Sequence, residues 1–296
     1  MIPGIDVSQW QRNMDWDAVR QSGVKFVFIK ATEFPNKTTK LRVDKKLKEN
    51  IYGASVNDIL WGAYHFFRTH IDPVIQAKLF CDAVGSFSSL PPIIHLEEAG
   101  MRGERLNYKV KLFIREVESL TGKKPIIYTG EGFWHSYMCY EKRSHTDWAR
   151  DYPLWVSQYT SLWPTAMYPW AGWDFWQYTK KGSIPGTTTA VNMNWFNGTE
   201  KDLAEKFSCN VNLTNEYNVP IMIEPAHAKM ISGAKTLSRA EETNNFKGDF
   251  QEPNFQFRNK NISRTEMSFQ ESKVVTENGI STREEDWIKD YFYQAA

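Results

Sequence analysis

The sequence has few of the features that mark a disulfide scaffold, a membrane protein or a polyanion-binding protein. Its three cysteines, Cys81, Cys139 and Cys209, are far apart and odd in number, which argues against a disulfide framework or a zinc site, so we expect reduced thiols. No apolar run reaches the roughly 20 residues that a membrane-spanning helix needs. Because the formal net charge is +1, electrostatics favour neither nucleic acid nor an anionic membrane surface as a partner.

The N-terminus also lacks the pattern of an export signal. Residues 1–4 lead directly into a strand-like segment, without a basic start or an apolar signal core. We therefore expect synthesis in the cytoplasm without a signal peptide. A role at a cell wall would then require release by lysis, carriage on a particle, or export without a cleaved signal.

What the sequence contains divides it into two regions. Eleven of the twelve tryptophans precede Phe207, and only Trp287 follows it. Region 1–207 alternates short apolar segments with amphipathic ones, which predicts parallel strands joined by helices. We expect strands at 4–7, 26–31, 60–67, 93–97, 125–129, 154–159, 174–178 and 190–194, and helices at 15–22, 44–59, 73–84 and 106–121. About eight strands predict a single closed α/β barrel, with loops or short strands instead of helices after Ala149.

Residues 208–296 have a different composition. Polar residues dominate, and single phenylalanines are scattered among Asn-, Glu- and Ser-rich stretches without a repeat. Such a segment buries too little apolar surface to fold alone, so we expect packing on the barrel or on a partner chain to order it. A capping box at 282–285 followed by an apolar face around Trp287 and Phe292 predicts a short terminal helix. Whether this face contacts the barrel or a partner stays open.

Chemically useful side chains gather where the expected strands end, which is the working face of a parallel barrel. The carboxylates are Asp6, Glu33 and Glu97, and the aromatic residues around them are Tyr64, Tyr128, Trp155, Tyr159, Trp176 and Tyr178. Aromatic rings stack on sugar rings, and a carboxylic acid can protonate a glycosidic oxygen. Aromatic enclosure should raise the pKa of such an acid into a useful range. There is no nucleophile elbow, phosphate loop or metal-ligand spacing, so we expect no metal and no cofactor.

Several segments carry a family resemblance. In order they are GIDVSQWQ, DWDAVRQSGVKFVFIKATE, WGAYHFFR, DPVIQAKLF, PPIIHLEEAG, KPIIYTG, PLWVSQY, FWQYT and NMNWFNGT. With them, residues 1–207 resemble the family-25 glycoside hydrolases, which are lysozymes of the N-acetylmuramidase type. The resemblance implies a (β/α)-type barrel with irregular last strands. It also implies cleavage of the β-1,4 bond between N-acetylmuramic acid and N-acetylglucosamine in bacterial peptidoglycan.

Carried over residue by residue, the resemblance makes Glu97 the general acid/base and Asp6 a carboxylate beside the reacting sugar. It implies a sugar trough shaped by Tyr64, Tyr128, Trp155, Gln158 and Trp176, with polar contacts from Glu33, His95, Asn192 and Asn194. Residues 208–296 have no counterpart in the resemblance. We expect them to have a protein partner, in an assembly or in self-association.

Two departures from the family pattern bear on activity. His95 stands where the family has the first residue of Asp-x-Glu, and Asn192 stands where its last strand has an aspartate; Phe34 replaces a usual glycine. An aspartate would stabilise an oxocarbenium-like charge, which a neutral imidazole cannot do and a protonated one opposes.

Two hypotheses of different class follow. The protein is a working muramidase that uses Glu97 and Asp6, or it is a weakened or inactive lysozyme-like module that serves as a structural or wall-binding part of a virion or tail assembly. A glycan-binding lectin is a third alternative. Under both of the first two hypotheses we expect a phage-associated protein. It would act at the cell wall after lysis or as part of a phage particle.

Overall fold

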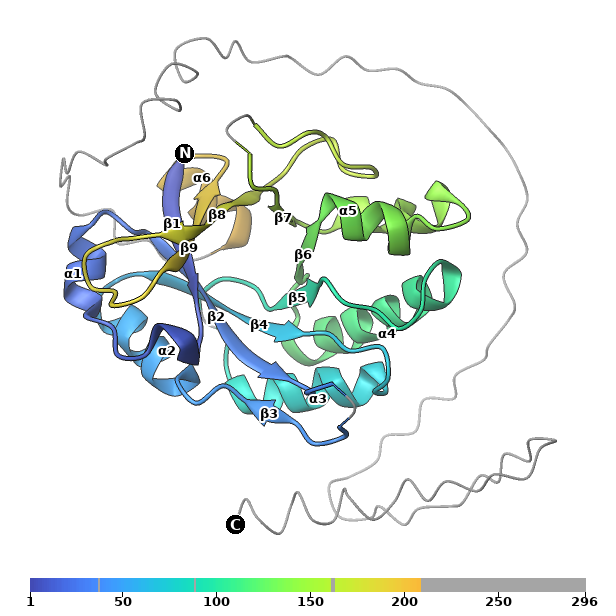
Figure 1. The fold of residues 1–296 in the computed structure, drawn as a ribbon, viewed down its shortest axis with the longest axis horizontal. Helices are drawn as coiled ribbons and strands as arrows, with labels where there is room; N and C mark the ends of the chain where they lie inside the picture. The colour runs from blue at the N-terminus through green and yellow to red at the C-terminus, as the bar shows by residue number, and fades with distance from the viewer. Residues whose placement is uncertain (37, 88, 161–162, 209–296) are drawn as a thin grey trace. The chain divides into compact units, whose positions relative to one another are not determined.

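The computed structural model describes residues 1–36, 38–87, 89–160 and 163–208. Its strands form one sheet in the order β1–β9–β8–β7–β6–β5–β4–β2–β3, and β1 also pairs with β2. Because the two-residue β3 (Arg42–Val43) lies outside this ring, eight strands form a closed barrel (Figure 1). The predicted α/β barrel is therefore confirmed.

The eight barrel strands correspond to the eight expected ones. They are β1 (Ile2–Val7), β2 (Phe26–Glu33), β4 (Leu60–Phe66), β5 (Ile93–Leu96), β6 (Ile126–Gly130), β7 (Leu154–Ser157), β8 (Phe175–Gly182) and β9 (Val191–Phe196). The alternation of strands and helices predicted a parallel sheet, but β9 runs antiparallel to both β8 and β1. The reason is the short connection 183–190, since a parallel return needs a crossover of about a dozen residues.

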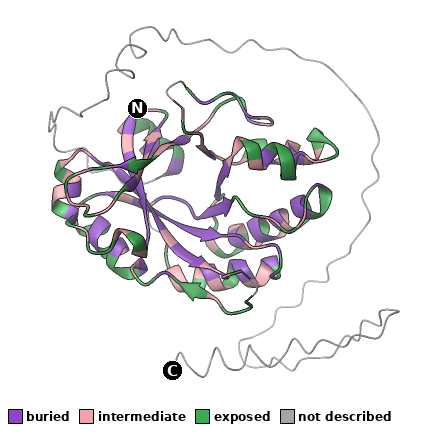
Figure 2. Ribbon diagram, viewed as in Figure 1, coloured by how far each residue is buried: buried purple, intermediate pink, exposed green. Residues whose placement is uncertain are grey.

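Helices cover the outside of the first strands. These are α1 (Trp16–Gln21), α2 (Leu47–Val56), α3 (Pro73–Val84) and α4 (Glu104–Thr121), and all four were predicted. Figure 2 shows their buried faces turned toward the strands and their exposed faces turned outward. Side-chain caps define the starts of α1 and α3. The Asp72 side chain accepts hydrogen bonds from Val74 N and Ile75 N, and Pro73 occupies the first turn.

Short helices complete the described chain. They are η1 (Gln9–Gln11), α5 (Glu131–Phe133), the π-helix η2 (Trp134–Met138), the 3-10 helix η3 (Arg143–Asp151) and α6 (Glu200–Phe207). Helix α6 corrects the expectation that the last part of the barrel has only loops or short strands. A Thr199–Asp202 capping box starts it, and Leu203 and Phe207 bury its inner face.

An aromatic core fills the barrel below its mouth. The Phe28 ring centroid lies 4.3 Å from that of Trp155 and 4.9 Å from that of Phe175. Gly4 leaves room for the Phe26 ring, because a Cβ at position 4 would come within 2.3 Å of it. A separate apolar layer, including Ile5, Val27 and Ile94, packs between the strands and the helices. The barrel is therefore a packed scaffold, and its interior holds side chains instead of a pore.

Three further expectations concern the C-terminal extension, the cysteines and membrane-spanning helices. The predicted C-terminal extension of residues 208–296, with its terminal helix, lies outside the described residues except for Ser208. Cys81 and Cys139 are free cysteines. No helix in the described part of the chain is both long and apolar enough to cross a bilayer.

Candidate active site

A hollow of about 410 Å³ occupies the mouth of the barrel, at the carboxyl ends of the parallel strands. Seven of the residues singled out in the sequence line it: Asp6, Tyr64, His95, Glu97, Tyr128, Tyr159 and Asn192. Asn192 stands opposite Asp6 in the β1–β9 pairing. Because β9 is antiparallel, it is the start of this strand, and not its end, that reaches the mouth.

Asp6 is buried in the hollow and surrounded by three side-chain amides. Its Oδ1 accepts a hydrogen bond from Asn192 Nδ2 at 2.8 Å, and its Oδ2 accepts from Gln177 Nε2 at 2.8 Å and Asn194 Nδ2 at 2.9 Å. Burial raises the pKa of Asp6, although the three hydrogen bonds favour its ionised form. Neutral dipoles from β8 and β9 therefore fix the position of this carboxylate without supplying a counter-charge.

Aromatic donors orient two of these amides. Gln177 Oε1 accepts hydrogen bonds from Tyr128 Oη at 3.1 Å and Tyr159 Oη at 2.7 Å, so its amino group faces Asp6. Trp155 Nε1 donates to Asn194 Oδ1 at 2.8 Å. The aromatic ring noted in the sequence therefore sets the hydrogen-bonding direction of the amides, in addition to forming walls.

Glu97 follows the end of β5 and stands at the rim of the hollow. Its side chain is 43% exposed, and its Oε2 lies 3.1 Å from His95 Nε2. Burial opposes its ionisation, but His95, Lys30 and Arg68 together hold the pKa of Glu97 below its ordinary value. The expectation of a raised carboxyl pKa therefore fits Asp6 and is wrong for Glu97, because cationic neighbours outweigh enclosure.

His95 lies below Glu97 among aromatic rings. It is 7% exposed, its ring stacks on Phe66 with centroids 4.9 Å apart, and its centroid lies 3.8 Å from that of Tyr128. Neither ring nitrogen makes an aligned hydrogen bond to any described residue. We therefore treat the contact with Glu97 as a charge contact that depends on protonation of the imidazole.

Two predicted trough residues lie away from the hollow. Trp176 is on the outer face of β8, where its Nε1 donates to Gln158 O at 2.7 Å. The Gln158 side chain turns to its own loop and accepts a hydrogen bond from Thr165 N at 3.2 Å. The reason is strand alternation: Phe175 and Gln177 face inward, so Trp176 between them must face outward.

Three more predicted residues do not line the hollow. Trp155 is fully buried in the barrel core, and Asn194 is 1% exposed beneath Asp6. Glu33 is surrounded by cations at the end of β2, with Lys30, Arg42 and Arg68 within 3.2, 3.2 and 3.7 Å. Trp155 and Asn194 therefore act from below the floor, whereas the carboxylate of Glu33 is already paired.

Sequence reasoning missed other lining residues, among them Trp10, Lys30, Gln177 and Lys180. Gln177 could have been found from its alternation with Phe175 in the FWQYT segment. Trp10 gave no signal beyond its place after the first strand. Its side chain is 70% exposed at the rim.

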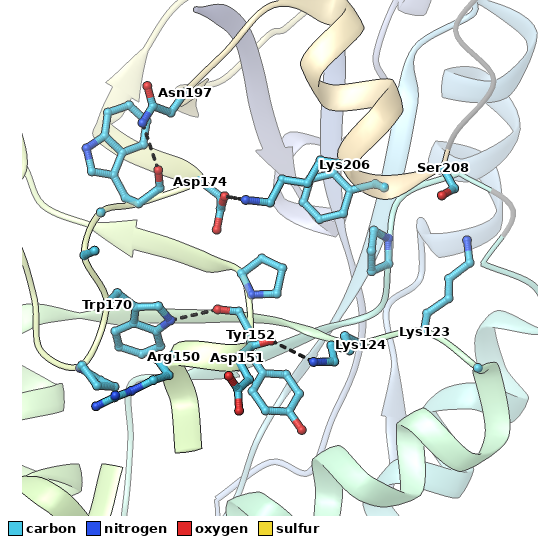
Figure 3. Close-up of a pocket in the computed structure, with 18 residues that line it drawn as sticks. Lys123, Lys124, Arg150, Asp151, Tyr152, Trp170, Asp174, Asn197, Lys206 and Ser208 are labelled. Atoms are coloured by element: carbon cyan, nitrogen blue, oxygen red, sulfur yellow. Dashed lines mark hydrogen bonds and ion pairs between the residues drawn. The ribbon is translucent and has the colours of Figure 1, made fainter. Parts of the chain in front are cut away.

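A larger hollow, of about 1250 Å³, lies elsewhere (Figure 3). Several of its lining residues, including Lys124, Pro153 and Asp174, precede β6, β7 and β8, so it lies at the opposite end of the strands from the mouth. Asp174 is occupied there by an ion pair to Lys206 and a hydrogen bond from Leu154 N at 2.9 Å. It lies at the end of the strands away from the carboxylates at the mouth, so its size does not make it the reactive site. No cluster of His, Cys, Asp and Glu side chains fit to bind a metal occurs among the described residues.

The mouth thus combines a rim carboxylate, a buried carboxylate and aromatic walls, which suits acid-catalysed cleavage of a glycosidic bond. Comparisons agree with this geometry. The uncharacterized protein YegX of Escherichia coli O157:H7 is 36% identical over 209 residues, covering 68% of this chain and 72% of that protein. Lysozyme M1 of Streptomyces globisporus is 29% identical, with coverage of 67% and 68%.

A solved structure and a family profile give the same result. The bacterial lysozyme from Streptomyces coelicolor matches with a TM-score of 0.61 at 28% identity, covering 69% of this chain and 95% of that one. The sequence profile described as "Glycosyl hydrolases family 25" matches residues 5–187, which is more than half of the chain. The chain therefore belongs to glycosyl hydrolase family 25.

Proposed function

We propose that this chain hydrolyses bacterial peptidoglycan at the β-1,4 bond between N-acetylmuramic acid and N-acetylglucosamine. The observation that carries the proposal is the convergence of Glu97 and Asp6 on one hollow at the mouth of the barrel. Tyr64 and Tyr128 line the same hollow and offer aromatic surface to a sugar ring. Family membership supports the reaction class.

Glu97 is the proposed proton donor to the glycosidic oxygen. Its rim position leaves it accessible, and its lowered pKa means that the protonated form needed for this step is favoured at acidic pH. Asp6 in its ionised form places negative charge where the cleaved sugar becomes positive. The three amide donors to Asp6 keep that oxygen pair in a fixed position.

A second candidate is a wall-binding module with weak or no hydrolysis. His95, 3.1 Å from Glu97, favours it, because a protonated imidazole opposes the positive charge that develops in the reaction. Asn192 likewise contributes an amide to Asp6 and not a charge. A phage-associated setting, free or in a particle, is a further proposal supported only by the polar composition of residues 208–296.

Clearing of a suspension of purified peptidoglycan tests the choice. We expect the wild-type protein to reduce turbidity and Glu97→Gln to lose about a hundredfold or more of the rate. Equal clearing by both proteins would remove Glu97 from the mechanism. If neither clears the suspension but both sediment with it, the wall-binding module is the correct function.

A further inference from the structure

Trp10 is presented to solvent on a rigid loop. It is 70% exposed, although a side chain of this size is usually well buried. Ser8 and Gln11 close a capping box around η1, and Gln11 Nε2 donates to the backbone of the β8–β9 connection at 3.1 Å. Gln9 N also donates to Asp44 Oδ2 at 3.0 Å. The exposed ring therefore stands on a backbone that three contacts fix, as a preorganised binding surface requires.

Trp10 borders two hollows. One is the mouth hollow, and the other, of about 490 Å³, is lined by Trp10 with Gln9, Arg12, Asn13, Lys45 and Lys46. Glu97 likewise borders the mouth hollow and a third hollow of about 460 Å³ over the loops that follow β4 and β5. The three hollows are therefore consecutive, with Glu97 at one border of the mouth hollow and Trp10 at another. A polymer cleaved at Glu97 has room on both sides.

The hollow beside Trp10 is basic. Arg12 and Lys45 are exposed and make no ion pair within the described part of the chain, whereas Lys46 pairs with Glu49 at 2.6 Å. Asp44 does not line this hollow; it is buried and accepts hydrogen bonds from the backbone N–H groups of Gln9 and Lys46. Those two bonds place the segment with Lys45 against the loop with Arg12. The hollow is thus suited to an anionic group.

The backbone at Arg12 supports a specific role for this loop. Its φ of 59° lies in the left-handed region, which a residue other than glycine rarely adopts. Strain of this kind persists where surrounding contacts impose it and is often found at ligand-binding positions.

The repeating structure of peptidoglycan matches the order of the mouth hollow, the Trp10 ring and the basic hollow. A neutral N-acetylglucosamine alternates along it with a muramic residue, whose lactyl arm carries a carboxyl group or an acidic peptide. If a muramic residue occupies the mouth hollow, the next sugar is neutral and the one after it again carries the anionic arm. We propose that Trp10 stacks on that neutral ring and that Arg12 and Lys45 bind the carboxylate of the following muramic arm. This inference rests on the proposed function, and it adds to the active site a distal subsite that recognises an anionic group.

Binding to soluble, uncross-linked peptidoglycan strands tests the subsite in a Glu97→Gln background, which prevents turnover. The strands are compared before and after their carboxylates are converted to neutral methylamides. We expect Trp10→Ala to weaken binding of both strands roughly tenfold. The pair Arg12→Gln and Lys45→Gln should weaken binding of the untreated strand alone by about threefold to tenfold, an effect that salt suppresses.

Matched surface changes serve as controls. Tyr108 on α4 is 60% exposed, and Lys201 on α6 is exposed and pairs with Glu205 of the same helix. Tyr108→Ala and Lys201→Gln should therefore bind both strands as the parent does. Thermal melting of all variants checks that the barrel remains folded.

The inference is overturned if Trp10→Ala binds both strands as the parent does, or if the charge pair loses the same affinity for neutral and anionic strands. A loss confined to walls that carry phosphate polymers would also overturn it, by assigning the hollow to phosphate. Failure of the proposed function gives a different result, namely no hydrolysis by the wild-type protein. Normal hydrolysis with unchanged binding in the variants contradicts the distal subsite alone.

Discussion

The two sides of the barrel mouth stabilise their carboxylates in opposite ways. On the amide side, formed by Gln177, Asn192 and Asn194, Asp6 is 5% exposed and has a raised pKa. On the cationic side, formed by Lys30, Arg68 and His95, Glu97 is 43% exposed and has a lowered pKa. The difference shows that neutral dipoles fix a buried carboxylate in place. Nearby cations instead lower the pKa of an exposed carboxylate, and so set the pH range in which it is protonated.

The two departures from the family pattern fall on different sides. An aspartate at position 192 would put a second carboxylate where Asn192 now donates to Asp6 at 2.8 Å, and like charges at that distance favour protonation of one of them. An aspartate at position 95 would replace the imidazole beside Glu97 and raise the pKa of Glu97. The present residues therefore avoid repulsion on one side, and on the other they lower the fraction of Glu97 that is protonated near neutral pH.

Removing the charge on the amide side should have the largest effect. Asp6→Asn places a fourth amide against Gln177, Asn192 and Asn194, and it removes the negative charge beneath the sugar. We expect about a hundredfold to a thousandfold loss in kcat. Release of reducing ends from peptidoglycan measures it, with circular dichroism as the folding control. An activity close to that of the wild type would mean that Asp6 is structural.

A buried histidine next to the cationic side provides an internal comparison with His95. His65 on β4 contacts Thr32 Oγ1 at 2.8 Å and Gln76 Oε1 at 3.0 Å, and burial lowers its pKa to about 4 from 6.5. Between these values the unfolded chain binds a proton that the folded chain does not. The free energy of unfolding should therefore fall as pH drops from 6.5 to about 4, by on the order of 3 kcal/mol.

Urea unfolding at a series of pH values measures this loss, and histidine-ring NMR assigns it to His65. A matched His65→Gln variant, which cannot take up this proton, should lack that part of the pH dependence. Titration of the His65 ring near pH 6.5 in the folded protein would contradict the account.

Introducing the family's aspartates at positions 95 and 192 should sharpen the comparison of the two sides of the mouth. We expect His95→Asp combined with Asn192→Asp to raise activity by roughly tenfold or more, because a negative charge replaces a group that opposes the developing positive charge. The two single variants separate the contributions of the two sides. No gain in the double variant would show that the sugar site itself differs from that of the family.

The pH profile should show the smallest effect. His95→Phe keeps an aromatic ring beside Phe66 and Tyr128 but removes the contact of His95 Nε2 with Glu97 Oε2 at 3.1 Å, so the pKa of Glu97 should rise. With Glu97 as the proposed proton donor, the alkaline limb of kcat against pH should move to higher pH. His135→Phe, at an exposed position on η2, is the matched control and should leave the limb in place. An unmoved limb in His95→Phe would show that His95 does not lower the pKa of Glu97.

Much of this site could be predicted from the sequence. Apolar segments fixed the eight strands, and strand ends located Asp6, Tyr64, Glu97 and Tyr128, because a parallel barrel gathers such residues at one face. The outward position of Trp176 could also have been read from alternation once Phe175 is placed inside. Local pattern therefore carries both the fold and the placement of Asp6 and Glu97 at the mouth of the barrel.

Other features depend on contacts that sequence spacing does not encode. The direction of β9 follows from a short connection, and it decides that Asn192 reaches the mouth. The lowered pKa of Glu97 requires Lys30 and Arg68, which come from different strand ends, to meet beside it. The pairing of Glu33 with Arg42 and Arg68 likewise removes from the hollow a carboxylate that the strand ends alone would place there.

The most direct measurement is the identity of the new reducing end. Purified peptidoglycan is digested with the wild-type protein and with Glu97→Gln, reduced with borohydride and hydrolysed to its amino sugars. The account predicts that reduced muramic acid accumulates with the wild-type protein and not with Glu97→Gln. Reduced glucosamine as the product, or equal amounts of reduced muramic acid from both proteins, would contradict it.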